Sequence, residues 1–544
     1  MNSNPSQAFP APPEVSAPRG GIEYKWKVLM TVIFGIFMVI LDTTVVNVAF
    51  QTLRAEFGAT LNDSQWIISI YVLSLGICTP LSGYLADRFG IKRVYLGGLA
   101  IFVIGSFLCG IAPNLWFLIG ARALQGFGGG VALPLGIALL LSSFPVAEQG
   151  AALGFFGIAA LTAPAVGPLL GGWLVDQNLW RFIFFINPPI GIIGVLLGTR
   201  FLRERKSERK PSLDLLGLVT EIIGFGSVLY GASLAANGDW TSPNVLTWFA
   251  IGAVGLIAFA VVELYIAKEP LLDIRLFQKR TFLNASLLGY VSVVALFGAE
   301  FLLPVYLQAL RGRTAFETGL ILLPMAITGA IFSVIAGRLY DRLGPRPLVG
   351  IGFGILLVNT WQLSQLQADT AISWIVFLLV LRGIALGLTV QTTLITALSV
   401  VPMRQLARGS SLSNATRNVV QSVGVALLAT VLASTLSPEV QALETQFLSA
   451  PPKVGAAPVA ICGTQTATLA SASGNPSGGG TPLPAGAFAL IARACKESVL
   501  GFERAYTVTF YASLIALVLG LMLPGWPFKW AGRRAADLPP AVGH

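Results

Sequence analysis

The sequence is poor in charged residues, histidine and cysteine. Only 11 % of its 544 residues are charged, whereas a soluble domain contains about 25 %. A protein of this composition cannot cover its surface in water. The single histidine is His544, and the four cysteines lack the spacing of a metal site. These absences exclude histidine catalysis, histidine metal sites and histidine proton relays. Because no nucleophile–base constellation is present either, we expect neither an enzyme nor a bound metal or cofactor.

Hydrophobic residues make up 55 % of the chain and gather in long runs. An apolar helix of about 20 residues crosses the hydrocarbon core of a bilayer, and such runs recur from Trp26 to Trp530. The sequence therefore predicts an all-α integral membrane protein surrounded by lipid. The net charge of +10 does not indicate nucleic-acid binding, because the basic residues cluster in alternate loops between the runs.

About fourteen spans can be placed along the chain. Six of them precede, and six follow, a pair of extra spans, so we expect two six-helix bundles with two inserted transmembrane helices. The predicted segments are a disordered tail at 1–23, the first bundle at 24–203, the inserted pair at 204–275, the second bundle at 276–530 and a second tail at 531–544.

The placement of Lys and Arg predicts the orientation. They gather in the loops after spans two, six, eight, ten, twelve and fourteen. Spans that alternate in direction place all these loops on one side, and the positive-inside rule makes that side the cytoplasm. Both termini are then cytoplasmic, whereas Arg311 and Arg313 fall outside as exceptions. The segment 1–23 lacks the regions of a signal peptide, so we expect a multi-pass protein of the cell (inner) membrane.

The segment 437–500 is predicted to form a long extracytoplasmic loop. It is rich in Ala, Gly, Ser, Thr and Pro, and because this composition buries little apolar surface we expect most of it to be mobile. Its cysteines, Cys462 and Cys495, either form a disulfide in the oxidising exterior or remain free thiols. The loop can serve a partner protein or shield the exit, and the sequence does not decide between these roles.

An internal repeat divides the chain into two halves. The segment Gly83-Tyr-Leu-Ala-Asp87-Arg88-Phe-Gly90 recurs as Gly337-Arg-Leu-Tyr-Asp341-Arg342-Leu-Gly344. Each copy ends the second span of a six-span block. The first copy resembles the Gly-x-Leu-Ala-Asp-Arg-x-Gly-Arg-Lys motif of the major facilitator superfamily, with Ile91 in place of a basic residue.

The resemblance implies the major facilitator fold and a conformational latch between the halves. In such a latch, Asp87 caps a helix or pairs with an arginine of the other half. The alternative is a simple helix connection whose charges only set the topology. The predicted latch residues are Gly83, Asp87, Arg88, Gly90, Arg93, Asp341 and Arg342.

The fourth and fifth spans carry further motifs. Arg122 and Gln125 lie in a glycine-rich fourth span, and an arginine inside a membrane is costly and usually functional. Arg122 resembles the arginine that the family uses in proton transfer. The structural alternative is that Arg122 only forms hydrogen bonds to backbone carbonyls. The fifth span resembles the family's antiporter signature, and a kinked packing helix is its alternative. The residues of that signature are Gly154, Ala163, Gly167, Pro168, Gly171 and Gly172.

Acidic residues inside spans are the candidate proton carriers. Asp42 and Asn47 in the first span match the Leu-Asp-x-Thr-x-x-Asn-x-Ala motif of drug:proton antiporters. Burial favours the neutral form of a carboxyl group, so Asp42 can carry a proton or hold a cationic drug. Glu300 in the ninth span is a second candidate, and Glu221 in the seventh is interpreted as more structural. Arg382 and Arg417 are second-tier candidates.

Together the motifs resemble the fourteen-helix drug:proton antiporters of the EmrB/QacA type, over about residues 24–530. The resemblance implies proton-coupled multidrug efflux of hydrophobic or cationic small molecules by alternating access, driven by the proton gradient and without a cofactor. We expect a monomer. The resemblance leaves open whether a periplasmic adaptor protein is a partner. The alternatives are a dedicated exporter of a metabolite, lipid or antibiotic and, less favoured because of the fifth-span motif, a solute:proton symporter.

Overall fold

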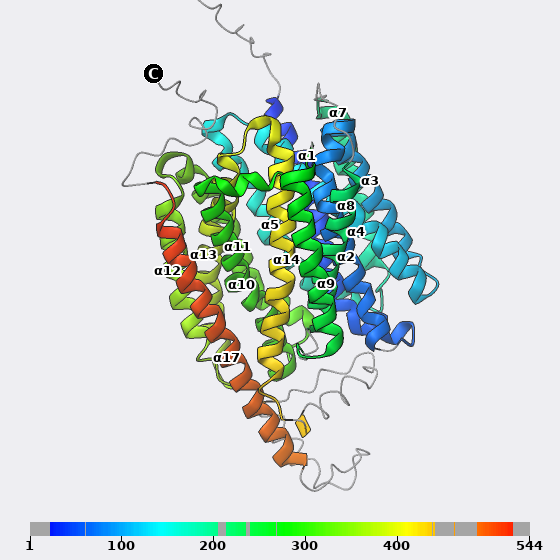
Figure 1. The fold of residues 1–544 in the computed structure, drawn as a ribbon. Helices are drawn as coiled ribbons and strands as arrows, with labels where there is room; N and C mark the ends of the chain where they lie inside the picture. Colours follow the sequence, from blue (N-terminus) through cyan, green and yellow to red (C-terminus); the bar gives the residue numbers. More distant parts are fainter. Residues whose placement is uncertain are drawn as a thin grey trace, which may run out of the picture.

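The computed structural model describes residues 22–59, 61–204, 214–235, 240–267, 269–437, 439–440, 462 and 487–525. Within these residues all regular secondary structure is helical. The long helices run side by side (Figure 1), and the N-terminal and C-terminal helices form two adjacent groups. The predicted tails and most of the predicted loop 437–500 lie outside the described residues.

Glycine turns and side-chain caps fix where several helices begin and end. Gly90 and Gly344 have φ values of 95° and 79°, a left-handed conformation that glycine adopts without strain. Asn114 caps one helix through Phe117 N–H. The N-terminal bundle consists of α1 (Tyr24–Glu56), α2 (Leu61–Phe89), α3 (Ile91–Gly110), α4 (Leu115–Ser143), α5 (Gln149–Asp176), the short α6 (Phe182–Phe185) and α7 (Asn187–Phe201).

The inserted pair and the second bundle follow. The inserted helices are α8 (Leu215–Ala235) and α9 (Pro243–Val261), and a π-helical turn extends α9 over Val262–Ile266. The C-terminal bundle consists of α10 (Arg280–Val305), α11 (Ala315–Leu343), α12 (Pro345–Leu363), α13 (Ile372–Ser399), α14 (Leu406–Ala433) and α17 (Ala487–Leu521).

Twelve described helices are long and apolar enough to cross a membrane, counting α6 with α7 as one. The other two long helices, α10 and α12, pack against α13 and α17 in the same bundle. Large apolar side chains are exposed on the outer helices, among them Leu196, Val254 and Ile257. Because lipid is the environment in which such a surface is stable, the protein is a multi-pass membrane protein with the predicted two bundles and two inserted helices.

The bundles meet mainly through two helix pairs, α5 with α11 and α2 with α14. The inserted helix α8 packs against both α2 and α14, and α9 packs mainly on α8. We call the end of the molecule that carries Tyr24 and Leu521 the terminal face and the opposite end the distal face; α2 and α11 end, and α5 and α14 begin, at the terminal face (Figure 1).

Candidate functional site

A buried ion pair lies inside the N-terminal bundle. The guanidinium of Arg122 in α4 donates from Nη1 to Oδ2 of Asp42 in α1 over 2.5 Å, and both side chains are at most 1 % exposed. An unpaired charge at this depth costs several kcal/mol, by an order-of-magnitude estimate. Each residue therefore makes burial of the other tolerable, and the loss of one charge leaves the second uncompensated.

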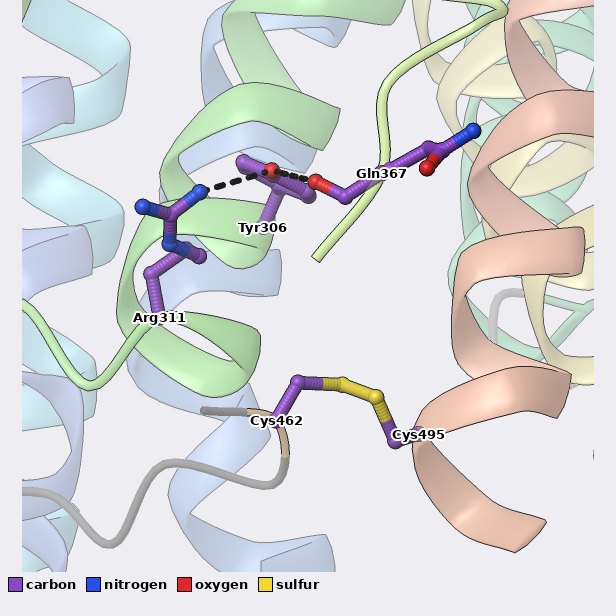
Figure 2. The surroundings of a disulfide bond; sticks show 5 residues. All are labelled: Tyr306, Arg311, Gln367, Cys462 and Cys495. Carbon is purple, nitrogen blue, oxygen red and sulfur yellow. Dashed lines mark hydrogen bonds between the residues drawn. A yellow bond between two sulfur atoms is a disulfide. The ribbon is translucent and has the colours of Figure 1, made fainter. Parts of the chain in front are cut away.

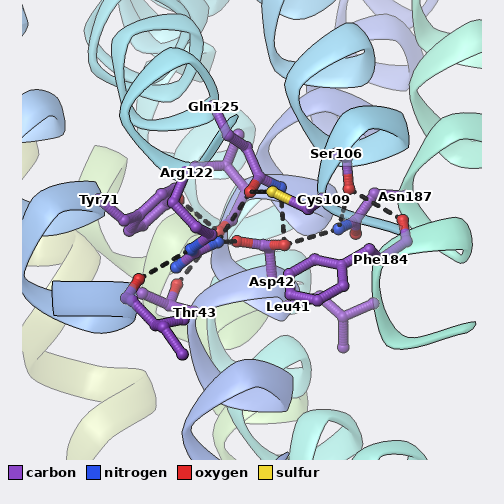
Figure 3. A network of polar contacts seen from close by, with 12 residues as sticks. Leu41, Asp42, Thr43, Tyr71, Ser106, Cys109, Arg122, Gln125, Phe184 and Asn187 are labelled. Atoms are coloured by element: carbon purple, nitrogen blue, oxygen red, sulfur yellow. Dashed lines mark hydrogen bonds and ion pairs between the residues drawn. The ribbon is translucent and has the colours of Figure 1, made fainter. Parts of the chain in front are cut away.

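The second oxygen of Asp42 is also occupied. Gln125 Nε2 and Asn187 Nδ2 both donate to Oδ1 over 2.7 Å (Figure 3). Asn187 donates further to Ser106 Oγ over 3.0 Å, and that hydroxyl donates to the Phe184 carbonyl. Three transmembrane helices, α1, α4 and α7, thus meet at one carboxylate, and α3 joins them through Ser106. Each of these three contacts to the Asp42 carboxylate comes from a hydrogen-bond donor.

Arg122 has its own set of partners. Its Nε donates to the Ile67 carbonyl over 3.1 Å and its Nη1 to Gln125 Oε1 over 2.8 Å. The guanidinium lies 4.0 Å from the centre of the Tyr71 ring, an attractive cation–π arrangement. The structure therefore combines the two roles that the sequence left open for Arg122, a carboxylate partner and a tie to a backbone carbonyl.

Among the described side chains, no other coupling candidate takes part in this network. Asn47 is exposed on α1, five residues beyond Asp42. Glu300 lies on α10, but its side chain is outside the described residues. Arg382 is fully buried in α13 and donates to Asn359 Oδ1 and to the Ala295 carbonyl.

The first copy of the repeated motif bridges the bundles at the terminal face. Arg408 of α14 donates from Nε to Asp87 Oδ2 of α2 over 2.8 Å. A Cβ atom at Gly83 would lie only 3.1 Å from Arg408 Cα, so glycine permits this close approach. Behind the turn at Gly90, the Glu204 carboxylate accepts hydrogen bonds from the Lys92 and Arg93 amides.

The second copy bridges the bundles in another way. Asp341 at the end of α11 accepts from the Gly150 and Ala151 amides over 3.0 and 3.2 Å. These are unsatisfied donors at the N-terminus of α5, where the helix dipole also favours a negative charge. Arg88 and Arg342 are both exposed. In this structure the two copies thus connect the bundles at the terminal face, one by an ion pair and the other by a helix cap.

The glycines of the fifth-span signature lie where α5 meets its neighbours. A Cβ atom at Gly154 would lie 2.7 Å from the Ser333 carbonyl of α11, and one at Gly172 would lie 2.8 Å from Phe316 N. Ser333 Oγ donates to the Gly154 carbonyl over 3.0 Å. Gly167 and Gly171 contact Thr44 and Val45 of α1 instead. Ala163 is fully buried, and Pro168 lies inside the helix. Helix α5 therefore joins the helix that carries Asp42 to the opposite bundle.

The structure joins Cys462 to Cys495 by a disulfide (Figure 2). It ties Cys462 to the distal part of α17, and Cys462 N–H donates to the Leu310 carbonyl over 3.0 Å. Arg311, close to this point, donates to the Thr370 carbonyl over 2.8 Å. Cys78 and Cys109 are buried free thiols.

A pocket lies in the C-terminal bundle between α10, α13 and α14. Tyr290, Thr393 and Arg417 are among its polar lining residues, together with several serines. Tyr290 donates to Thr416 Oγ1 over 2.8 Å. The lining combines apolar side chains with hydroxyl groups and the Arg417 guanidinium.

Sequence reasoning did not assign roles to several of these residues. Asn187 has no predicted role, and its contact with Asp42 spans 145 positions. Arg408 was visible only as a loop charge. The sequence signal for Asn187 is its position inside an apolar span, directly before Pro188 and Pro189.

Two helical bundles with a repeated bridging motif, a lipid-facing surface and a buried charge network define a multi-pass membrane transporter. The chain belongs to the Major Facilitator Superfamily, whose profile matches residues 32–425.

Relatives support this assignment. The chain is 38 % identical to the uncharacterized MFS-type transporter YhcA of Bacillus subtilis over 74 % of this chain and 76 % of the relative. It is 34 % identical to the multidrug export protein EmrB of Escherichia coli K12, over 74 % and 80 % of the two chains. The lincomycin resistance protein LmrB of Bacillus subtilis is 30 % identical, over 75 % and 85 %.

Solved structures share the fold. The human organic anion transporter MFSD10 matches with a TM-score of 0.57 at 13 % identity, over 90 % of this chain and all of the other. A bacterial homologue of the human lysosomal transporter Spinster, in an inward-facing conformation, has a TM-score of 0.55 at 15 % identity, with 92 % and 98 % covered.

Proposed function

We propose that this transporter is a proton-coupled multidrug efflux antiporter that works by alternating access. The observation that carries the proposal is the saturated environment of Asp42, which pairs with Arg122 and accepts from Gln125 and Asn187. A proton on Asp42 cancels the charge that holds Arg122, and the packing of four helices at this point then changes. Relatives named as multidrug resistance and export proteins support the efflux role.

The orientation that we propose places the terminal face in the cytoplasm of a cell carrying the protein in its inner membrane. Basic residues at that face include Lys92, Arg93, Arg203 and Lys279, as the positive-inside rule requires. The Asp87–Arg408 ion pair then closes the cytoplasmic side, and breaking it is the step that opens the transporter inward.

Exchange follows from this geometry. With the terminal face closed, a proton from outside reaches Asp42 and weakens its pairing with Arg122. The protonated protein opens inward and takes up the drug as the proton leaves to the cytoplasm. Because the carboxylate is restored only after the proton leaves, inward proton flow and outward drug flow are linked. The pocket around Tyr290 and Arg417 is the proposed contact for hydrophobic or cationic molecules.

A second candidate function differs from the first in its substrate class. A dedicated exporter of one metabolite, lipid or antibiotic fits the same architecture, and the relative named for lincomycin resistance favours it. We propose that a monomer suffices for transport; a periplasmic adaptor is a further proposed partner.

A transport assay in everted membrane vesicles tests the proposal. Vesicles with wild-type protein should accumulate a fluorescent cationic dye when respiration acidifies their lumen, and a protonophore should abolish accumulation. Asp42→Asn should lose this uptake at normal expression. Asp369→Asn, at an exposed carboxylate between α12 and α13, is the matched control and should retain it. Dye uptake by Asp42→Asn at the wild-type rate would refute the assignment of Asp42 as carrier.

A further inference from the structure

The inserted helix pair contains carboxyl groups that the mechanism above does not use. Glu221 of α8 is 0 % exposed, and neither of its carboxyl oxygens has a hydrogen-bond partner. Glu263, at the end of α9, is 1 % exposed; its Oε1 accepts from Leu271 N–H over 3.1 Å, and its Oε2 has no partner. An ionised carboxylate buried without a donor is strongly disfavoured, whereas the neutral acid is tolerated.

These groups lie along one face of α8. A Cβ atom at Gly217, one turn before Glu221, would meet the Asp214 carboxylate and would lie 3.1 Å from Glu263 Oε1. Asp214 precedes α8 and accepts from Gly217 N–H through Oδ1, while its Oδ2 is buried without a partner. The three carboxyl groups thus form a row that starts at the terminal face and leads inward.

Few other titratable side chains face this row. In the described part of the chain, Cys78 of α2 lies close enough to interact electrostatically with Glu221, and Arg408 of α14 with Glu263. Each neighbouring element thus contributes at most one such group, and Asp214 adds another negative charge next to Glu263. The described side chains include no group of three His, Cys, Asp or Glu that could hold a metal ion. A bound proton is the ligand that fits the carboxyl oxygens without a hydrogen-bond partner.

The row also touches the latch. Arg408, which pairs with Asp87, donates from Nη1 to the Pro270 carbonyl over 3.2 Å. Pro270 directly precedes Leu271, whose amide binds Glu263. The segment after α9 therefore connects the carboxyl row to the ion pair that joins the bundles.

We propose that Glu221 and Glu263 form a second proton-binding site, built by the inserted helices, whose charge the latch arginine senses. Glu221 holds its proton as a neutral acid, and Glu263 exchanges a proton with water at the terminal face. An ionised Glu263 attracts Arg408 and competes with Asp87 for it. A protonated Glu263 leaves Arg408 to Asp87, so low pH at the terminal face tightens the latch.

Infrared spectroscopy of the full-length protein in lipid vesicles tests the proton site without any transport. The wild type should show, at neutral pH, the carbonyl stretch of a protonated carboxylic acid that shifts in D₂O. Glu221→Gln should lose this component, while Glu56→Gln, at an exposed carboxylate at the end of α1, should keep it. An unchanged band in Glu221→Gln overturns the site. Gln is isosteric with the neutral acid, so equal thermal stability of both variants at neutral pH is the expected check on folding.

The link to the latch rests on the proposed alternating access and has its own test. Glu263→Gln mimics the protonated state permanently. Its transport rate should depend less on the pH at the terminal face than that of the wild type, because the charge at position 263 no longer changes. A wild-type pH profile in an active Glu263→Gln protein overturns the link, and the infrared band decides separately on the proton site.

Discussion

The Asn187 side chain donates to the same oxygen of Asp42 that Gln125 occupies, over 2.7 Å in both cases. Asn187 is the first residue of α7, and Asp42 lies in the middle of α1. One carboxyl group of α1 is thereby connected to a helix that begins 145 residues later. This contact is the basis of the first prediction.

Asn187→Ala should lower both the rate of transport and the stability of the folded protein. The variant removes one donor to the buried Asp42 carboxylate and leaves Oδ1 with Gln125 alone. A hydrogen bond to a charged group is worth about 1.5–3 kcal/mol. The measurements are the initial rate of dye transport in proteoliposomes and the melting temperature of the purified protein. Wild-type values of both would contradict the donor role of Asn187.

The latch should respond to charge reversal at both ends. Asp87→Arg alone should reduce transport strongly, since it places two cations together, and Asp87→Arg with Arg408→Asp should recover part of the activity. Because both side chains are about one-fifth exposed, we expect a modest coupling free energy of about 1 kcal/mol. Transport rates of the two single variants and the double variant give this quantity. Strictly additive losses would show that the ion pair has no part in the cycle.

The close contact of α5 with α11 should not tolerate a larger side chain. Gly154→Val should reduce transport at least several-fold, because its side chain meets the Ser333 carbonyl and overpacking costs about 1–3 kcal/mol. Gly97→Val is the matched control, since a Cβ atom there meets nothing within 4 Å. Transport per folded molecule, measured after size-exclusion chromatography, distinguishes the two. Equal activity of both variants would refute a required close approach.

The disulfide should stabilise the distal part of α17. It closes a loop with a sequence separation of 33 residues, for which the chain-entropy relation gives about 3–4 kcal/mol. The double variant Cys462→Ser, Cys495→Ser should therefore unfold at a lower temperature than the wild type, and reduction of the wild type should have the same effect. Mass spectrometry without reductant verifies the bond. Equal melting temperatures would contradict a stabilising role.

The sequence was sufficient to predict the helices and the membrane fold, because hydrophobic runs and local motifs act over short distances. Asp42, Arg122 and Gln125 each stand in such a motif. The contact of the latch is not encoded locally: Arg408 reaches Asp87 across 321 positions, and only packing brings α14 to α2. The contact between Glu263 and Gly217 of α8 could not be predicted either, because Glu263 approaches Gly217 from another helix.

Glu221 shows how burial changes an interpretation. In the sequence it is one carboxyl group in an inserted span and was interpreted as more structural. The structure buries it completely without a donor, a fact that depends on how α8 packs between α2 and α14. No local pattern in the sequence encodes that packing.

Substrate-induced proton release from the purified protein tests the central claim most directly. Addition of a transported drug to wild-type protein in weakly buffered solution should release protons, about one per Asp42 that titrates in the cycle. Asp42→Asn should bind the drug and release none from this site, and Asp369→Asn should behave as the wild type. Equal proton release from Asp42→Asn and wild type would contradict the account that Asp42 carries the exchanged proton.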